Sequence, residues 1–298
     1  MSDFVRFLIA GVSLGSIYAL ISLGFVVIYR ATGVVNFSQG GLVVLGAFVT
    51  HQLAVVNAIP FVFAVPLAMA IVAGVGLLLE RVVFRPMVGQ PVFAMILLTL
   101  GVVFILEQIC ATFWGYDVVL LGDPWGVATT EIFGTTVNVS DLWTIGSTAA
   151  ALLAFFALFR YTTLGIAMRA GAADPEAALA HGISPQAIHG ISWAIAGAVA
   201  TVAGVFLAAG PKGVDIGLGL VAFRAFPAMI LGGLESAEGA VIGGVLIGLI
   251  EVLSAAYLVP ALPMLGANFH VVMPYIVMVA ILVVRPHGLF GTPEVRRA

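Results

Sequence analysis

Polar side chains interrupt an apolar segment near the start of the chain. The stretch NFSQGG, at 36–41, places Asn36 and Gln39 beside two glycines inside an otherwise hydrophobic run. Irregular backbone at membrane depth is tolerated only where protein buries it or where it lines a water-filled cavity. Either these amides bond to a neighbouring helix, or the stretch lines a pathway. The second interpretation gives the candidate pathway residues Asn36, Phe37, Gln39 and Gly40.

A second interrupted segment lies in the other half of the chain. It reads LVAFRAFPAMILGGLESAEG, at 220–239, and carries Arg224 and Pro227. Paired interrupted segments in two halves are typical of inverted-repeat transporters, whose pathway runs between the halves. The sequence therefore predicts that 33–46 and 220–239 flank one pathway, and Arg224 joins the candidate residues.

Two acidic residues, Glu107 and Glu251, lie within apolar spans. A charged side chain there costs about 2.5–3.5 kcal/mol on insertion scales, so both should face protein or water. Each belongs either to a proton or ion relay or to a protonated or hydrogen-bonded packing site, and Glu107 joins the candidate pathway. Because no His, Asp or Glu residues pair at ligand spacing and Cys110 is the single cysteine, no metal site is predicted.

Composition indicates which class of protein holds these residues. Of 298 residues, 62% are hydrophobic and 8% are charged, against about 25% charged in a soluble domain. The chain is therefore predicted to be an integral membrane protein surrounded by lipid. A net charge of −3, from 11 basic and 14 acidic residues, is too small and scattered for nucleic-acid binding.

The apolar runs predict an all-α, polytopic membrane fold in a single transmembrane domain, 1–298. A bilayer core about 30 Å thick needs about 20 apolar residues per helix. The seventh run is too short to cross comfortably and is predicted to be broken or half-depth, so eight or nine helices are expected. In the eighth run, two overlapping GxxxG spacings predict close helix packing. The candidate spans are 4–29, 34–57, 60–79, 92–113, 142–159, 187–209, 222–234, 239–258 and 269–284.

Basic residues set the predicted orientation, since cytoplasmic loops are enriched in Lys and Arg. Loop 114–141 carries four acidic residues and no basic one, which agrees with an external position. The N-terminus is therefore expected outside and the C-terminus in the cytoplasm, with Arg224 on the external side. Eight of the 11 basic residues then share the cytoplasmic side: Arg30, Arg81, Arg85, Arg160, Arg169, Arg285, Arg296 and Arg297.

The longest predicted cytoplasmic loop, 160–186, holds start and stop signals for one short helix. Asp174 is an N-cap residue followed by Pro175 at the first helical position, and Gly182 is placed to end the helix. Ser184 and Pro185 begin the next span by the same logic. A capped helix of about two turns along the membrane face suits the docking of a cytoplasmic partner.

Six separated stretches match the pattern of a known family. They are SLGSIYALISLGFVVIY (13–29), NFSQGG (36–41), ERVVFRPM (80–87), RAGAADPEAALAHGI (169–183), FRAFPAMILGGLESAEGAVIGG (223–244) and PHGLFGTPEV (286–295). Together they resemble the permease subunit of branched-chain amino-acid ABC importers, from the first span to the C-terminus. The family commonly has an acidic residue where Gly41 stands, so no role carries over to that position.

The resemblance implies a bacterial inner-membrane subunit that works by alternating access with several partners. These are a second, related permease, two cytoplasmic ATPase subunits and an external substrate-binding protein. The chain has no GxxxxGK[ST] motif, so no cofactor is expected on it and ATP is bound and hydrolysed by the partners. In the family, the loop is the coupling helix that docks on the ATPase, and the corresponding residues are Arg169, Ala173, Asp174, Ala178, Gly182 and Ile183.

Three functions remain open on the sequence. The first is an ABC importer permease for leucine, isoleucine, valine or a related small amphipathic solute, with no covalent chemistry of its own. The second is a self-sufficient ion-coupled transporter that uses Glu107 and Glu251. The third, an intramembrane enzyme, ranks last because no Ser/His, Cys/His or paired-Asp arrangement lies at membrane depth.

Overall fold

The computed structural model describes residues 2–132, 134–173 and 175–291. Across these ranges, seven helices are long and apolar enough to cross a membrane, and two shorter apolar helices cover 218–232 and 269–284. The predicted all-α polytopic membrane fold, with short or broken segments, is confirmed. The helices are α1 (Ser2–Thr32), α2 (Gln39–His51), α3 (Phe61–Leu79), α4 (Val92–Trp114), α5 (Val139–Tyr161), α6 (Thr163–Ala173), α7 (Pro175–Ala180), α8 (Pro185–Leu207), α9 (Leu218–Phe223), α10 (Phe226–Gly232), α11 (Ala237–Leu253), α12 (Val259–Ala261) and α13 (Phe269–Val284).

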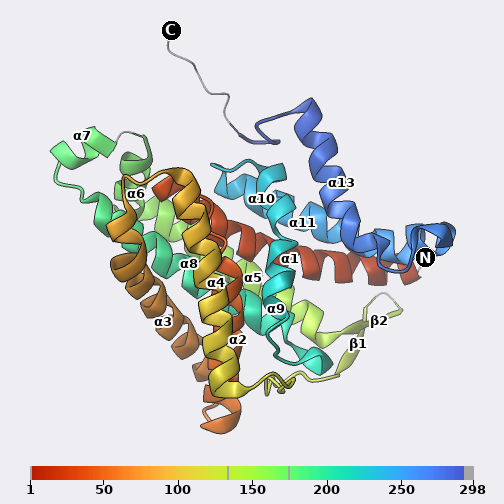
Figure 1. The fold of residues 1–298 in the computed structure, drawn as a ribbon. Helices are drawn as coiled ribbons and strands as arrows, with labels where there is room; N and C mark the ends of the chain where they lie inside the picture. The colour runs from red at the N-terminus through yellow and green to blue at the C-terminus, as the bar shows by residue number, and fades with distance from the viewer. Residues whose placement is uncertain (1, 133, 174, 292–298) are drawn as a thin grey trace.

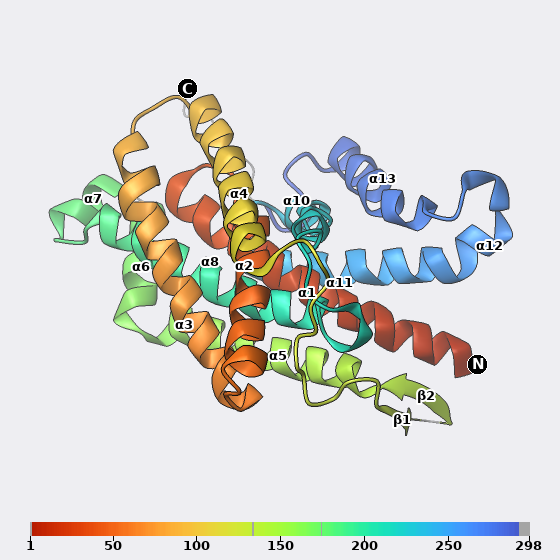
Figure 2. The same ribbon diagram turned by 60° about the horizontal axis from the view of Figure 1, so that its bottom comes forward.

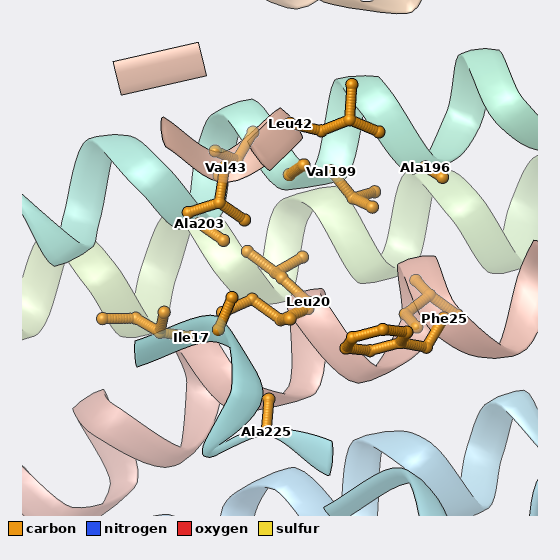
Figure 3. Close-up of a cluster of buried hydrophobic side chains, with 14 of the residues drawn as sticks. Ile17, Leu20, Phe25, Leu42, Val43, Ala196, Val199, Ala203 and Ala225 are labelled. Carbon is orange, nitrogen blue, oxygen red and sulfur yellow. The ribbon is translucent and has the colours of Figure 1, made fainter. Parts of the chain in front are cut away.

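Helix α1 runs through the centre of the bundle (Figures 1 and 2). Its stretch from Tyr18 to Phe25 is buried on all sides. Helices α8 and α11 pack directly on it, α2 packs on α8, and α3 and α4 lie outside them. Leu20 of α1 faces a cluster from α8 and α2 (Figure 3), in which Ala196 and Ala203 leave room for the larger side chains.

Small residues allow the close contact between α1 and α11. A Cβ placed on Gly15 would come within 2.6 Å of the Cα of Val245, and one on Gly248 would overlap the backbone of Gly15. One on Gly244 would overlap Ala19. The GxxxG spacings therefore serve helix packing, as the sequence indicated.

The two interrupted segments do not begin and end where hydrophobicity placed them. Residues 33–38 are unwound, so that α2 begins at Gln39 rather than within the run from 34. The short seventh run is two helices, α9 and α10, which are separated at Arg224 and Ala225. The expectation of a broken helix in that run is confirmed.

The loop 114–141 contains a small antiparallel hairpin that the all-α prediction did not include. Strand β1 (Thr129–Ile132) pairs with β2 (Thr135–Asn138), with Thr129 opposite Asn138. β-Branched residues favour strands, and Gly134 in the turn has a φ of +70°, which glycine adopts without strain. The hairpin lies at the end of the bundle that holds the N-terminus, opposite α7 (Figures 1 and 2).

Substituting Gly248 with valine is expected to destabilise the bundle, because the added side chain would overlap α1. Overpacking of this kind costs about 1–3 kcal/mol. The measurement is the temperature at which the detergent-purified protein loses its monodisperse peak in size-exclusion chromatography. Gly101→Ala is the matched control, since Gly101 lies in α4 with no atom within 4 Å of an added Cβ. Equal midpoints for the two variants would contradict the packing role of Gly248.

Candidate functional site

The two interrupted segments meet inside the bundle. The ring of Phe37, in the unwound stretch before α2, lies 5.7 Å from the ring of Phe226 and 6.1 Å from that of Phe223. The side chain of Gln39 lies against Gly24, eight residues before the end of α1. At 1.5 Å per residue this is about 12 Å along the helix, so the chain turns back into the bundle before α2 starts.

Neighbouring helices satisfy carbonyl groups around the break between α9 and α10. The hydroxyl of Ser22 on α1 donates to the carbonyl oxygen of Ala225 at 2.9 Å, and Tyr275 on α13 donates to that of Phe223 at 3.3 Å. Irregular backbone at membrane depth requires such partners. Hydrophobicity did not reveal Ser22, although it is one of few polar residues within the first span.

The amide side chains of NFSQGG are buried but only half satisfied. The Oδ1 atom of Asn36 accepts hydrogen bonds from the backbone N–H and the hydroxyl of Ser38, at 3.1 and 2.5 Å. Gln39 donates from Nε2 to the carbonyl oxygen of Ala196 at 3.3 Å. The Nδ2 of Asn36 and the Oε1 of Gln39 have no hydrogen-bonding partner among the described residues. Hydrogen bonds inside the chain therefore satisfy one polar atom of each side-chain amide, and the other polar atom is buried without a partner that explains its position.

Two further candidate residues meet at Gly219 of α9. A Cβ on Gly40 would lie 2.9 Å from the carbonyl oxygen of Gly219, and one on Gly219 would overlap the carboxylate of Glu107. Glu107 is partly exposed, and no hydrogen bond joins it to another described side chain. Helices α2, α4 and α9 thus contact one another through glycines, with one carboxylate beside them.

Arg224 lies at the break between α9 and α10. Its Nη1 is 3.4 Å from Oε1 of Glu251, just past the middle of the apolar helical span Ala237–Ala261, which α11 begins. Tyr18, midway along α1, donates to Oε2 of the same carboxylate at 2.7 Å. Counting charges did not reveal this pair, because the carboxylate that holds Arg224 comes from another apolar helix.

The structure gives the two acidic residues, for which the sequence left a relay or a packing role open, different surroundings. Glu251 is hydrogen-bonded to Tyr18 and paired with Arg224, which fits the packing interpretation of this carboxyl. Glu107 lies against α9 without such partners among the described residues. Those residues also contain no group of three or more His, Cys, Asp or Glu that could hold a metal ion.

The segment 160–186 forms two helices, α6 and α7, where the sequence indicated one. Helix α7 ends in a Schellman motif: Ile183 donates its N–H to the carbonyl of Ala178, Gly182 donates to that of Leu179, and Gly182 has a φ of +81°. The Ser184 cap is also present, its hydroxyl accepting from Ala187 N–H at 3.4 Å.

The other coupling residues have different environments. Arg169, on α6, donates to the carbonyl of Phe159 and places its guanidinium 5.3 Å from the centre of the Phe159 ring, so it is held against α5. It also lines a cavity of about 390 Å³ with Arg30 and Phe290. Asp174 lies outside the described residues, and the side chain of Ala173 is likewise not described.

A family model described as the branched-chain amino acid transport system permease component matches residues 7–282. The chain belongs to this permease family. Its members are transport components, which places the chain among permeases rather than enzymes. The match includes both interrupted segments, the two-helix segment and the contacts between α1 and α11.

Curated relatives of the permease cover nearly the whole chain. The high-affinity branched-chain amino acid transport system permease protein LivH of Escherichia coli K12 is 30% identical, over 99% of this chain and 97% of its own length. The protein BraD of Pseudomonas aeruginosa, described in the same words, is 26% identical over 99% and 98%. A probable branched-chain amino acid transport permease protein LivH of Methanocaldococcus jannaschii is 30% identical over 93% and 89%.

Asn36→Leu is expected to abolish transport by the permease while its assembly persists. The change removes the Oδ1 atom that accepts hydrogen bonds from Ser38 and the Nδ2 donor that has no partner among the described residues. The lost hydrogen bond lowers the stability of the fold by about 0.5–1.5 kcal/mol. Uptake in vesicles and recovery of the intact protein are the measurements. Asn268→Leu is the control, because Asn268 also precedes a helix but is exposed and makes no capping bond. Normal uptake by Asn36→Leu would contradict a pathway role for Asn36 and favour the packing interpretation.

Proposed function

We propose that this chain is a transmembrane permease subunit that imports branched-chain or related amino acids by alternating access. The permease lies in a bacterial inner membrane, and its proposed partners are a second, related permease, two cytoplasmic ATPase subunits and an external binding protein. The observation that carries the proposal is the meeting of two broken segments, around Phe37 and Phe226, in a chain of this family. Such breaks are where membrane transporters place their solute pathway.

The proposed pathway follows the partly exposed side of this junction. Phe37, Glu107 and Arg224 each keep part of their surface exposed, whereas Asn36 and Gln39 are buried behind them. We assign the exposed residues to the surface that faces the second permease, with the solute passing between the two subunits. The buried amides then become accessible when α9 and α10 move away from α2.

The segment α6–α7 is the proposed coupling element. It lies at the opposite end of the bundle from the N-terminus and the hairpin (Figure 2). The Schellman motif fixes the direction in which the chain leaves α7 and enters α8, so that a push on α7 is transmitted to a helix packed on α1. ATP is bound and hydrolysed by the partner subunits, and the chain binds no cofactor of its own.

A self-sufficient ion-coupled transporter is the second candidate function, and Glu107 is the observation that favours it. Ionisable side chains at membrane depth mark ion pathways and proton relays, and no ion pair with a described residue gives the Glu107 carboxylate a structural role. Ion-driven uptake by proteoliposomes that contain this chain without ATPase subunits distinguishes the two functions.

Gly182→Val is expected to uncouple ATP hydrolysis from uptake. No atom lies within 4 Å of a Cβ at Gly182, so the change acts through its positive φ alone, which a β-branched residue resists by roughly 1–2 kcal/mol. Gly182→Asn is the matched control, since asparagine tolerates this conformation, and Glu176→Gln controls for charge. ATPase co-purification and ATP-dependent leucine uptake are measured together. Wild-type values of both in Gly182→Val would remove the coupling role.

The proposed orientation places the hairpin end outside and α7 in the cytoplasm. In a Cys110→Ser background, Val127→Cys is expected to react with an impermeant thiol reagent added outside intact cells, and Glu176→Cys is expected to react only after permeabilisation. Both positions are exposed in the structure, at opposite ends of the bundle. The reverse pattern of labelling would invert the topology.

A further inference from the structure

Arg224 is held in place by the carboxylate of Glu251 on α11, yet its side chain remains partly exposed. Tyr18 and Glu251 are buried, whereas 35% of the side-chain surface of Arg224 is exposed. Tyr18 occupies the second oxygen of the carboxylate, which fixes the orientation of the Glu251 side chain. One part of the guanidinium is therefore anchored and another part faces outward.

The contact with Glu251 uses little of the bonding capacity of Arg224. A guanidinium carries five N–H donors in a planar fork. One hydrogen bond from it is seen among the described residues, and its length of 3.4 Å exceeds the about 2.7–2.9 Å of a strong bond to a carboxylate. Arg85 provides the contrast within the same chain, because it binds both oxygens of Glu80 at 2.7 and 3.1 Å.

We propose that Arg224 binds the α-carboxylate of the amino acid in transit, and that Glu251 and Tyr18 are positioning residues for it. The assignment rests on the proposed import function and names its substrate contact. A planar fork with unused donors matches a carboxylate in a bidentate arrangement. Phe223, the residue before Arg224, has its ring 6.1 Å from that of Phe37, and the two rings offer an apolar surface to a branched side chain.

The depth of the site supports this assignment. Tyr18 lies midway along α1, and Glu251 lies just past the middle of the apolar helical span Ala237–Ala261, which α11 begins. Substrate sites of membrane transporters lie near the midplane, at interrupted helices. A zwitterionic substrate loses hydration of its carboxylate there, and charge-assisted hydrogen bonds replace that hydration. A purely structural ion pair would gain more from the closed geometry that Arg85 and Glu80 adopt.

The test measures binding of labelled leucine to the purified full transport complex without its external binding protein. Two competitors of the labelled leucine are compared: unlabelled leucine and 3-methylbutylamine. The amine keeps the ammonium group and the side chain but lacks the carboxylate. In the wild type, the amine is expected to compete at least tenfold less well than leucine, equal to about 1.4 kcal/mol. Arg224→Ala is expected to abolish this preference and Arg224→Lys to restore part of it. Glu251→Gln and Tyr18→Phe should reduce it, and Arg85→Ala should leave it unchanged.

Three results would overturn the assignment. The first is that Arg224→Ala keeps the wild-type preference for leucine over the amine. The second is that the wild-type complex binds no leucine. The third is that the Arg224 variants lose thermal stability but keep the preference, which marks a structural ion pair. ATP-dependent uptake by the same wild-type preparation tests the proposed function separately. If the wild type transports leucine while Arg224→Ala keeps its preference, the carboxylate contact alone is wrong. If no amino acid is taken up, the import function is wrong.

Discussion

Every backbone polar group at membrane depth needs a hydrogen-bonding partner, and this requirement shapes the centre of the permease. Continuous helices supply their own partners, but the chain around 33–38 and 224–225 cannot. Ser22 and Tyr275 supply partners to the second break, and Asn36 closes a turn on Ser38 in the first. The two breaks lie together, with Phe37 stacked on Phe226, so a single protein-lined region shelters both from lipid.

The arginines show how position changes the use of one kind of ion pair. Arg85 binds Glu80 through two hydrogen bonds at the end of the α3 span, where the pair satisfies itself. Arg224 makes one long contact with Glu251, and Tyr18 takes up the rest of that carboxylate. The more deeply placed pair is thus the less complete one. A partly exposed guanidinium that is anchored but has unused donors is available to a ligand of opposite charge, because that ligand meets donors that packing does not use.

The sequence predicted the membrane class, the nearly complete set of helices and the existence of both breaks, because hydrophobicity and glycine spacing are local signals. The helix end at Gly182 and the N-cap at Ser184 were also predicted from the sequence, since caps depend on adjacent residues. Hydrophobicity could not show that α2 starts only at Gln39, because Val34 and Val35 are as apolar as the residues of a membrane-spanning helix. The pair of Arg224 with Glu251 was not predicted, because contacts between helices are not local signals. Tyr18 and Ser22 were missed because their partners lie more than 200 residues away. The hairpin was missed because four-residue strands leave little periodicity.

The central position of α1 affects the order in which the molecule can be assembled. Tyr18 and Glu251 are separated by 233 residues in the chain. At synthesis rates of about 5–20 residues per second, the first helix waits on the order of 10–50 s for the carboxylate that its tyrosine will bind. During that time a helix whose middle stretch will be buried is surrounded by lipid, and Tyr18 has only temporary partners. Helix α1 thus enters the membrane before the helices that pack on it, and its contacts are among the last to be completed.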